Sequence, residues 1–256
     1  MNNFQDEVRA RIASYDENKA LNEAAASFML HSTGPKYSYN FSWQGRPIIQ
    51  YPQDIIAMQE LIWDIKPDLI IETGIAHGGS LIFSASMLAL LDIVDAISDN
   101  VSLSPNTSKR KVIGIDIDIR PHNKEAILRH PMSSRIEMIE GSSVGIEIID
   151  KVKEIASQYS KVLIFLDSNH THEHVLKELE AYAPLVSVGS YCIVFDTVVD
   201  QLPASMYPDR PWGPGDNPKS ALKEYLKSHP EFLIDKEVSS KLLISVAPDG
   251  YLKRVY

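Results

Sequence analysis

Residues 68–80 read Asp-Leu-Ile-Ile-Glu-Thr-Gly-Ile-Ala-His-Gly-Gly-Ser, and the order of patterns in this stretch decides the fold. Asp68 to Glu72 is a short, apolar run bounded by acids, which is typical of a strand covered on both faces. Glycines at positions 74, 78 and 79 predict a turn, and Ser80 to Ala96 reads as a helix. Ligands bind at the carboxyl ends of strands in open α/β sheets, so this turn is a candidate ligand site.

The spacing of these glycines excludes two common phosphate-binding motifs. The dinucleotide fingerprint G-x-G-x-x-G does not fit glycines at 74, 78 and 79, and a Walker A motif needs Lys where Ser80 stands. An ordinary tight turn between a strand and a helix remains the alternative interpretation.

Outward from this stretch, strand and helix patterns alternate, which predicts an α/β fold with a mainly parallel, seven-stranded sheet flanked by helices. The other expected strands are 112–116, 136–140, 162–167, 190–195, 232–234 and 242–246. The other expected helices are 55–65, 122–129, 144–159, 172–182 and 220–228. We expect residues 53–256 to form this domain and residues 1–52 to form an extension, with a helix over 5–30 and an aromatic loop over 31–52.

Bulk composition limits the function classes. The net charge of the 256 residues is −9, which argues against nucleic acid as a partner, since that binding depends on Lys and Arg. Cys192 is the single cysteine, so no internal disulfide forms. The polar N-terminus lacks a signal peptide, and Ser84, Ser86 and Asp92 interrupt the longest apolar stretch, 81–94. We expect a soluble, cytoplasmic protein that does not bind a membrane.

Polar residues follow the second and third strands. Asp116 ends the second strand, where a carboxylate can accept hydrogen bonds from both hydroxyls of a ribose. We assign helix capping to Asp118, which precedes Arg120 and Pro121. Ser143 follows the third strand and is placed to contact an adenine ring, but N-capping of the next helix is the stronger interpretation from sequence.

Two further acids end the fourth and fifth strands. Asp167 opens the run Asp-Ser-Asn-His-Thr-His-Glu-His, residues 167–174, and Asp196 lies in Val-Phe-Asp-Thr, residues 194–197. If the two strands are neighbours, both carboxylates face one cleft, and such oxygen ligands favour Mg²⁺. The spacing of His170 and His174 also suggests zinc, although the HExxH signature is absent. Two unrelated helix caps are the structural alternative.

Several segments together resemble the cephalosporin hydroxylase family of class I S-adenosylmethionine-dependent O-methyltransferases, which includes rhamnosyl and macrolide-sugar O-methyltransferases. The segments are WQGRPIIQYPQD, IIETGIAHGGS, LDSNHTHEHV, RPWGPGDNP and KLLISVAPDGYLKR, and the similarity covers roughly residues 40–256. The resemblance implies a Rossmann-like methyltransferase fold and methyl transfer to a hydroxyl of a small molecule, namely a sugar or glycosylated natural product. We also expect a homo-oligomer.

The resemblance implies roles for individual residues. Asp167 and Asp196 are expected to bind Mg²⁺, with His170 as the general base and Asp167 beside it in the catalytic group. The expected S-adenosylmethionine-binding residues are Glu72, Gly74, His77, Gly78, Ser80, Asp116, Ser143 and Asp167. One position departs from the family pattern: Phe195 stands where sugar methyltransferases of this group carry an acid, so Thr197 or water would have to supply the oxygen.

Two alternatives belong to other function classes. An oxidative, β-lactam hydroxylase-type enzyme would need His170, His174 and Asp167 to converge as a 2-His-1-carboxylate iron site. A non-catalytic subunit that binds S-adenosylmethionine would not depend on His170. Residues 200–215, with Tyr207 and Trp212, and the aromatic N-terminal segment are expected to close over the site.

Overall fold

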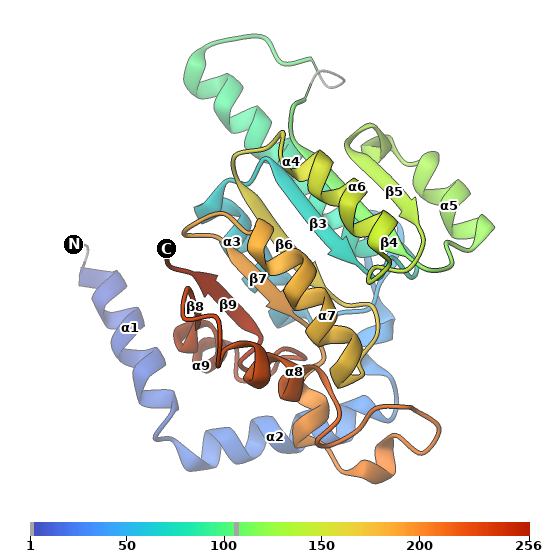
Figure 1. Ribbon diagram of the computed structural model, residues 1–256. Helices are drawn as coiled ribbons and strands as arrows, with labels where there is room; N and C mark the ends of the chain where they lie inside the picture. The colour runs from blue at the N-terminus through green and yellow to red at the C-terminus, as the bar shows by residue number, and fades with distance from the viewer. Residues whose placement is uncertain (1–2, 105–107) are drawn as a thin grey trace.

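The computed structural model describes residues 3–104 and 108–256, and its centre is the predicted seven-stranded sheet (Figure 1). The strand order is β5-β4-β3-β6-β7-β9-β8. The strands are β3 (Leu69–Thr73), β4 (Lys111–Asp116), β5 (Ile136–Glu140), β6 (Val162–Leu166), β7 (Tyr191–Val194), β8 (Phe232–Ile234) and β9 (Tyr251–Arg254). β9 alone runs opposite to the other six strands, because it pairs antiparallel with both β7 and β8. The predicted α/β class with a mainly parallel sheet is therefore confirmed.

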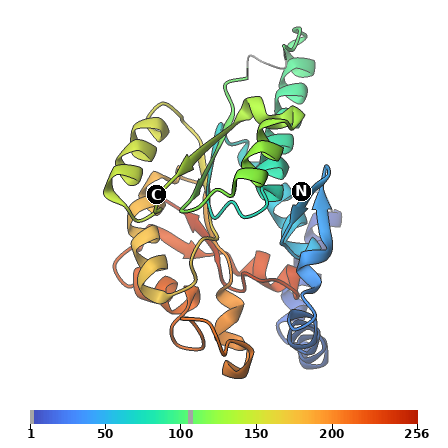
Figure 2. The same cartoon turned by 90° about the vertical axis from the view of Figure 1, so that its right-hand side faces the viewer.

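Helices cover both faces of the sheet, as the view along its edge shows (Figure 2). One face packs against α3 (Pro52–Ile65), α4 (Gly79–Asp99), α5 (Pro121–Leu128) and α9 (Lys236–Leu242). The other packs against α6 (Ile146–Ala156), α7 (His172–Tyr182) and α8 (Pro218–Tyr225). Because both faces are covered, every residue of β3 and β6 is buried, which explains their continuous apolar sequences.

The N-terminal residues add two helices and a small hairpin. These are α1 (Asn3–Tyr15), α2 (Lys19–Thr33), β1 (Phe41–Trp43) and β2 (Arg46–Ile48). The single helix predicted over 5–30 is wrong, because Asn18 caps a new helix by accepting a hydrogen bond from Leu21 N. The hairpin packs on α4, where Trp43 Nε1 donates to Ser86 Oγ at 2.9 Å.

The strand predicted at 242–246 is also wrong. Leu242 ends α9, and Leu243 has a φ of 59°, which turns the chain away. Ser245 Oγ and Val246 N then donate to the buried carboxylate of Asp54, so this segment is anchored to α3 rather than paired in the sheet. The last strand is formed by Tyr251–Arg254 instead.

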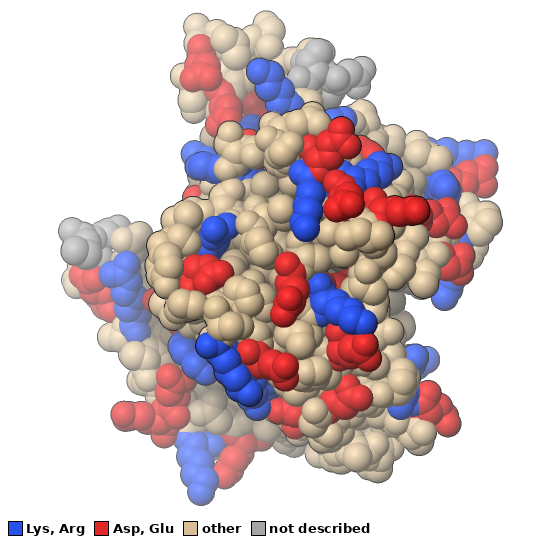
Figure 3. All heavy atoms as spheres, in the orientation of Figure 1, with Lys and Arg blue, Asp and Glu red and all other residues tan. Residues whose placement is uncertain are grey.

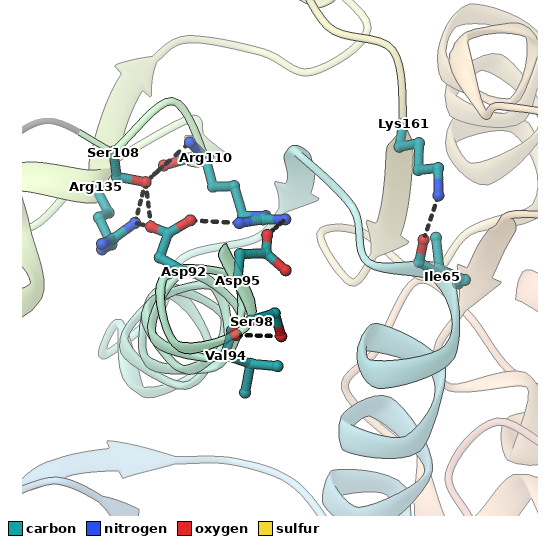
Figure 4. A network of polar contacts seen from close by, with 9 residues as sticks. All are labelled: Ile65, Asp92, Val94, Asp95, Ser98, Ser108, Arg110, Arg135 and Lys161. Carbon is teal, nitrogen blue, oxygen red and sulfur yellow. Dashed lines mark hydrogen bonds and ion pairs between the residues drawn. The ribbon is translucent and has the colours of Figure 1, made fainter. Parts of the chain in front are cut away.

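Helix α4 is the one described helix with the length and apolarity of a membrane span, but 61% of its apolar window is buried within the fold. Its predicted end at Ala96 is three residues early, since it continues to Asp99. Near that end, Asp92 binds Arg110 and Arg135, and Arg110 also binds Asp95 at 2.7 Å (Figure 4). This cluster ties α4 to the residues that enter β4.

Charged side chains of both signs are interspersed on the face that α6 and α7 cover (Figure 3). The exposed ion pairs of α6 and α7 include Lys177 with Glu173 and Lys151 with Glu137. Such exposed pairs contribute little to stability individually.

Candidate active site

A cavity of about 610 Å³ lies at the carboxyl ends of β3, β6 and β7. The glycine turn after β3 and the residues that follow β6 and β7 form its base. The segment 29–51 and the segment 198–212 form its walls. Met29, Tyr51, Val198 and Leu202 pack together, so these two walls touch each other. Tyr39, Tyr51, Tyr207 and Trp212 of the two aromatic segments all line the cavity, and their closure over the site stays a prediction.

Close backbone packing explains the glycines of the turn. Gly74 has a φ of 90°, and a Cβ there would overlap the carbonyl oxygen of Asp167. A Cβ on Gly79 would overlap the carbonyl oxygen of Pro47 in the hairpin. Arg46 Nη2 donates to the His77 carbonyl at 2.6 Å, so the hairpin holds the turn. The turn is thus built to bring β3, β6 and the hairpin together at the cavity.

Glu72 is buried beneath the turn, with 2% of its surface exposed. Ser80 Oγ donates to its Oε1, whereas its Oε2 is buried without a hydrogen-bond partner among the described residues. Burial raises the pKa of Glu72 to about 8, against the lowering effect of the Ser80 hydrogen bond. A buried acceptor with no donor is a place where a cationic or hydrogen-bonding ligand group would be favoured.

Asp116 lies beside the turn and holds its backbone. Its Oδ2 accepts from Ile75 N at 2.8 Å and Ala76 N at 3.3 Å, and its Oδ1 accepts from Asp118 N at 3.1 Å. The capping role assigned to Asp118 is wrong: α5 follows Arg120 and has no side-chain cap. Asp116 is at the predicted strand end, and its ribose role stays a prediction.

Ser143 is buried on the other face of the sheet. Its Oγ lies 3.0 Å from His174 Nε2, and its carbonyl accepts from Tyr182 OH at 2.5 Å. The N-capping interpretation is wrong, because Gly145 precedes α6 and Ser143 bonds elsewhere. Glu72, Asp116 and Ser143 do not line the cavity, whereas Gly74, His77, Gly78 and Ser80 do. Some of the predicted cofactor residues therefore line the cavity, and the others lie outside its lining.

Asp167, His170 and Asp196 form one group at the cavity base, with one ligand atom from each within 4.8 Å of the others. β6 and β7 are adjacent and parallel, which confirms that their terminal acids share a cleft. His170 Nε2 lies 3.1 Å from Asp196 Oδ2. Burial and the nearby Asp196 carboxylate raise the pKa of Asp167 well above its usual range. The two carboxylates in this arrangement suit a divalent cation such as Mg²⁺, and the imidazole lies directly beside them.

The other histidines have separate partners. His170 precedes α7, so its four-residue spacing from His174 is not a helical pair and the zinc interpretation loses its basis. His174 contacts Ser143 and Ser168, and therefore does not join the iron triad proposed for an oxidative enzyme. His172 lies 2.8 Å from Ser220 Oγ, at α8.

Neither residue beside Asp196 supplies the missing oxygen. Phe195 is buried against Phe165, with ring centroids 6.1 Å apart. Thr197 is fully buried, and its Oγ1 donates to the Pro248 carbonyl at 2.8 Å. The possibility that Thr197 acts as a metal ligand is therefore wrong. Any remaining ligands of a bound cation would come from water or from the acceptor.

Three cavity residues were not anticipated from the sequence. Gln50 Nε2 donates to Asp167 Oδ2 at 3.2 Å, and its Oε1 is buried without a partner among the described residues. Lys36 and Arg210 line the walls. Gln50 belongs to a segment that carried the family resemblance, but it lies 117 residues from Asp167, and no local pattern reports such a contact.

Known proteins resemble this chain in sequence and in fold. Rhamnosyl O-methyltransferase of Mycobacterium tuberculosis (strain ATCC 25618 / H37Rv) is 27% identical over 208 residues, covering 78% of this chain and 73% of that protein. The protein of the same name from Mycobacterium leprae (strain TN) is 26% identical over 215 residues, covering 83% and 82%.

Among solved structures, CmcI with Mg-SAM gives a TM-score of 0.56 at 18% identity, covering 85% of this chain and 78% of that chain. The apo-structure of CmcI gives 0.54 at 19%, covering 85% and 77%. These structures confirm the Rossmann-like methyltransferase fold. A family model described as Rhamnosyl O-methyltransferase/CmcI matches residues 35–255. The match spans most of the sequence and includes the whole cavity base, so the chain belongs to the rhamnosyl O-methyltransferase/CmcI family.

Proposed function

We propose that this chain is an S-adenosylmethionine-dependent O-methyltransferase that methylates a hydroxyl of a sugar or of a glycosylated natural product, assisted by Mg²⁺. The relatives named rhamnosyl O-methyltransferase and the CmcI structure with Mg-SAM support this function. The observation that carries it is one cavity in which the glycine turn after β3 adjoins the Asp167–His170–Asp196 group. A methyl donor and a hydroxyl acceptor would meet in that space.

The residues present fit both cofactors. The glycine turn at Gly74 and Gly78 lines the cavity and suits the amino-acid part of S-adenosylmethionine, and the unpartnered Oε2 of Glu72 is buried beneath that turn. Asp167 and Asp196 offer the oxygen ligands that Mg²⁺ prefers. When bound, S-adenosylmethionine supplies an electrophilic methyl group and Mg²⁺ favours the ionised form of an acceptor hydroxyl.

His170 is the proposed general base, which takes the proton from the acceptor hydroxyl. Asp196 lies 3.1 Å from its Nε2 and would stabilise the imidazolium that results. The Trp212 ring meets the imidazole edge-on, with centroids 4.9 Å apart, which restricts its rotation and limits access of water. Much of the acceleration would come from holding the two reactants in line.

Calorimetric titration tests the cofactor assignment. S-adenosylmethionine should bind saturably and NAD should not, with Mg²⁺ binding measured separately. The His170→Ala variant should keep cofactor affinity but lose methylation rate by about 100-fold or more. Absence of donor binding with and without Mg²⁺ would reject the function, and an unchanged rate in His170→Ala would favour a non-catalytic binding subunit.

The location and the oligomeric state of the chain are two further parts of this proposal. We propose a cytoplasmic location, supported by the single cysteine, Cys192, which is free and buried. We also propose a homo-oligomer, for which Phe4, Ile97 and Leu103 provide exposed apolar surface outside the cavity. Light scattering on the purified chain measures the assembly, and a monomer at micromolar concentration would contradict it.

A further inference from the structure

The charges that line the cavity are divided between its base and its walls. The acids Asp167 and Asp196 lie at the base, beside His170. The bases Lys36 and Arg210 belong to the two opposing wall segments, and both are exposed to solvent. An acceptor whose hydroxyl lies at the base of the cavity would therefore extend towards solvent between the positive charges of Lys36 and Arg210.

Neither Lys36 nor Arg210 forms an ion pair in the part of the chain that the structure describes, although the chain has 34 acids and 25 Lys and Arg residues. Each head group lies instead over an aromatic ring of the same cavity. Lys36 Nζ is 5.5 Å from the Tyr39 centroid, and Arg210 Cζ is 5.1 Å from the Trp212 centroid. A cation–π contact steadies the head group but leaves its charge unneutralised.

The position of Arg210 relative to the reacting group can be bounded. The Trp212 ring that lies under Arg210 also contacts His170, with centroids 4.9 Å apart. Because both contacts share this ring, the guanidinium carbon lies within about 10 Å of the imidazole centroid. This upper limit allows one sugar to offer a hydroxyl to His170 and an anionic substituent to Arg210.

Hydrogen bonds fix the backbone from which Lys36 extends. Lys36 N donates to the Thr33 carbonyl at 3.0 Å, and the Lys36 carbonyl accepts from Tyr39 N at 3.0 Å. The residue therefore starts from a defined turn at the end of α2, with a φ of 57°. Its amine is positioned by that turn and by Tyr39, rather than by a carboxylate.

We propose that Arg210 and Lys36 form an anion subsite for the acceptor, so that the sugar to be methylated carries a phosphate or carboxylate group. Guanidinium and ammonium groups bind both oxyanions, and Arg binds them in a bidentate manner. This inference rests on the proposed function, since it concerns the acceptor of the same cavity. It narrows the substrate class from glycosides in general to anionic ones.

Binding of matched probes to the full chain tests the subsite. Rhamnosyl phosphate, methyl glucuronide and neutral methyl rhamnoside would be titrated at low ionic strength, with and without S-adenosylhomocysteine and Mg²⁺. The variants are Arg210→Gln, Arg210→Lys and Lys36→Gln. Lys66→Gln is the matched control, because Lys66 is also exposed, has a φ of 52° and lies 5.5 Å from the Trp63 centroid, but does not line the cavity.

A charged probe should bind at least about tenfold more tightly than the neutral one, and Arg210→Gln and Lys36→Gln should each remove about fivefold to tenfold of that affinity. Arg210→Lys should lose less, and Lys66→Gln nothing. The tighter of the two anions identifies phosphate or carboxylate as the source. Equal affinity for neutral and charged probes, or equal effects of Lys36→Gln and Lys66→Gln, would overturn the subsite.

The same titrations separate this inference from the proposed function. S-adenosylhomocysteine binding is measured on the wild-type chain before any acceptor probe is added. If the wild-type chain does not bind S-adenosylhomocysteine, the methyltransferase assignment is rejected. The titrations without cofactor still decide whether the cavity prefers anionic probes. Intact cofactor binding without anion preference would reject the subsite alone.

Discussion

Glu72 is the buried acid whose protonation should shape the pH dependence of stability. Burial raises its pKa to about 8, so the folded chain binds a proton that the unfolded chain has already released above its ordinary pKa of 4.5. The free energy of unfolding should therefore fall as pH rises from about 4.5 to about 8. The slope from this one group approaches about 1.4 kcal/mol per pH unit inside that window.

Urea unfolding at several pH values compares the wild type with Glu72→Gln, which keeps a group able to bond Ser80. The variant should lack this part of the decline, so the two stabilities should diverge towards pH 8 in favour of the variant. Parallel stability profiles would show that Glu72 does not titrate in this range. The Glu72 carboxylate also raises the pKa of Asp167, so the difference between the two profiles reports Glu72 together with its effect on Asp167.

Gly74 should tolerate no side chain, for two separable reasons. Its φ is 90°, and a Cβ would also overlap the Asp167 carbonyl oxygen. Gly74→Ala should lower stability by about 3 kcal/mol or more and abolish cofactor binding. Gly189→Ala is the matched control, since its φ is 83° with nothing within 4 Å. That control should lose only about 1 kcal/mol of stability. Equal losses in the two variants would mean that the positive φ alone accounts for the effect of Gly74→Ala.

Site residues differed in how far the sequence revealed them. Asp167 and Asp196 were predictable because each ends a strongly apolar strand, and parallel strands end at the same edge. Ser143 was placed correctly after β5, but its contact with His174 depends on how α6 and α7 pack. Lys36, Gln50 and Arg210 lie in irregular segments whose position only tertiary contacts determine.

Among the elements, the β1–β2 hairpin should act on the cofactor site without touching the reacting group. Arg46 joins the His77 carbonyl to Asn123 Oδ1 at 2.9 Å, which links the turn to α5. Arg46→Ala should weaken cofactor binding by about tenfold, because the turn loses its charged hydrogen bonds. Arg129→Ala is the control just after α5, where the pair of Arg129 with Glu125 is exposed.

Calorimetry with S-adenosylhomocysteine measures this prediction, and circular dichroism confirms that both variants fold. An affinity in Arg46→Ala equal to that of Arg129→Ala would show that the turn keeps its geometry without the hairpin. The hairpin would then be packing surface only.

Elements with one dominant pattern were predicted well, and those that depend on a distant partner were not. β3 and β6 are apolar throughout because both faces are covered, so sequence alone identifies them. Residues 242–246 are as apolar as a strand. However, Ser245 and Val246 donate hydrogen bonds to Asp54, and β9 pairs with β7 instead. The family and fold were predicted correctly since several segments agreed in order.

At the scale of the whole molecule, Asp54 connects helix α3 to the segment that leads into β9. Its fully buried carboxylate accepts from Ser245 Oγ at 2.6 Å, Val246 N at 3.0 Å and Tyr251 OH at 2.9 Å. Asp54→Ala should lower the free energy of unfolding by about 3 kcal/mol, because three buried donors lose their acceptor. Asp150→Ala, at an exposed position on α6, should change it by less than about 0.5 kcal/mol.

Chemical denaturation at one pH measures both Asp54→Ala and Asp150→Ala. Similar small losses would mean that the C-terminal segment is held by apolar packing and that the Asp54 network is replaceable. A large loss with an unchanged denaturant slope would show that α3 and the segment around β9 unfold together.

The insertion of β9 between β7 and β8 has a consequence for synthesis on the ribosome. β8 is made before β9, yet it reaches the sheet only through β9, which pairs with both strands. Until Tyr251–Arg254 leave the exit tunnel, the edge of β7 stays open and β8 has no partner in the sheet. The nascent chain therefore presents an unpaired strand edge until β9 emerges, and this is the interval in which we expect a chaperone to bind it.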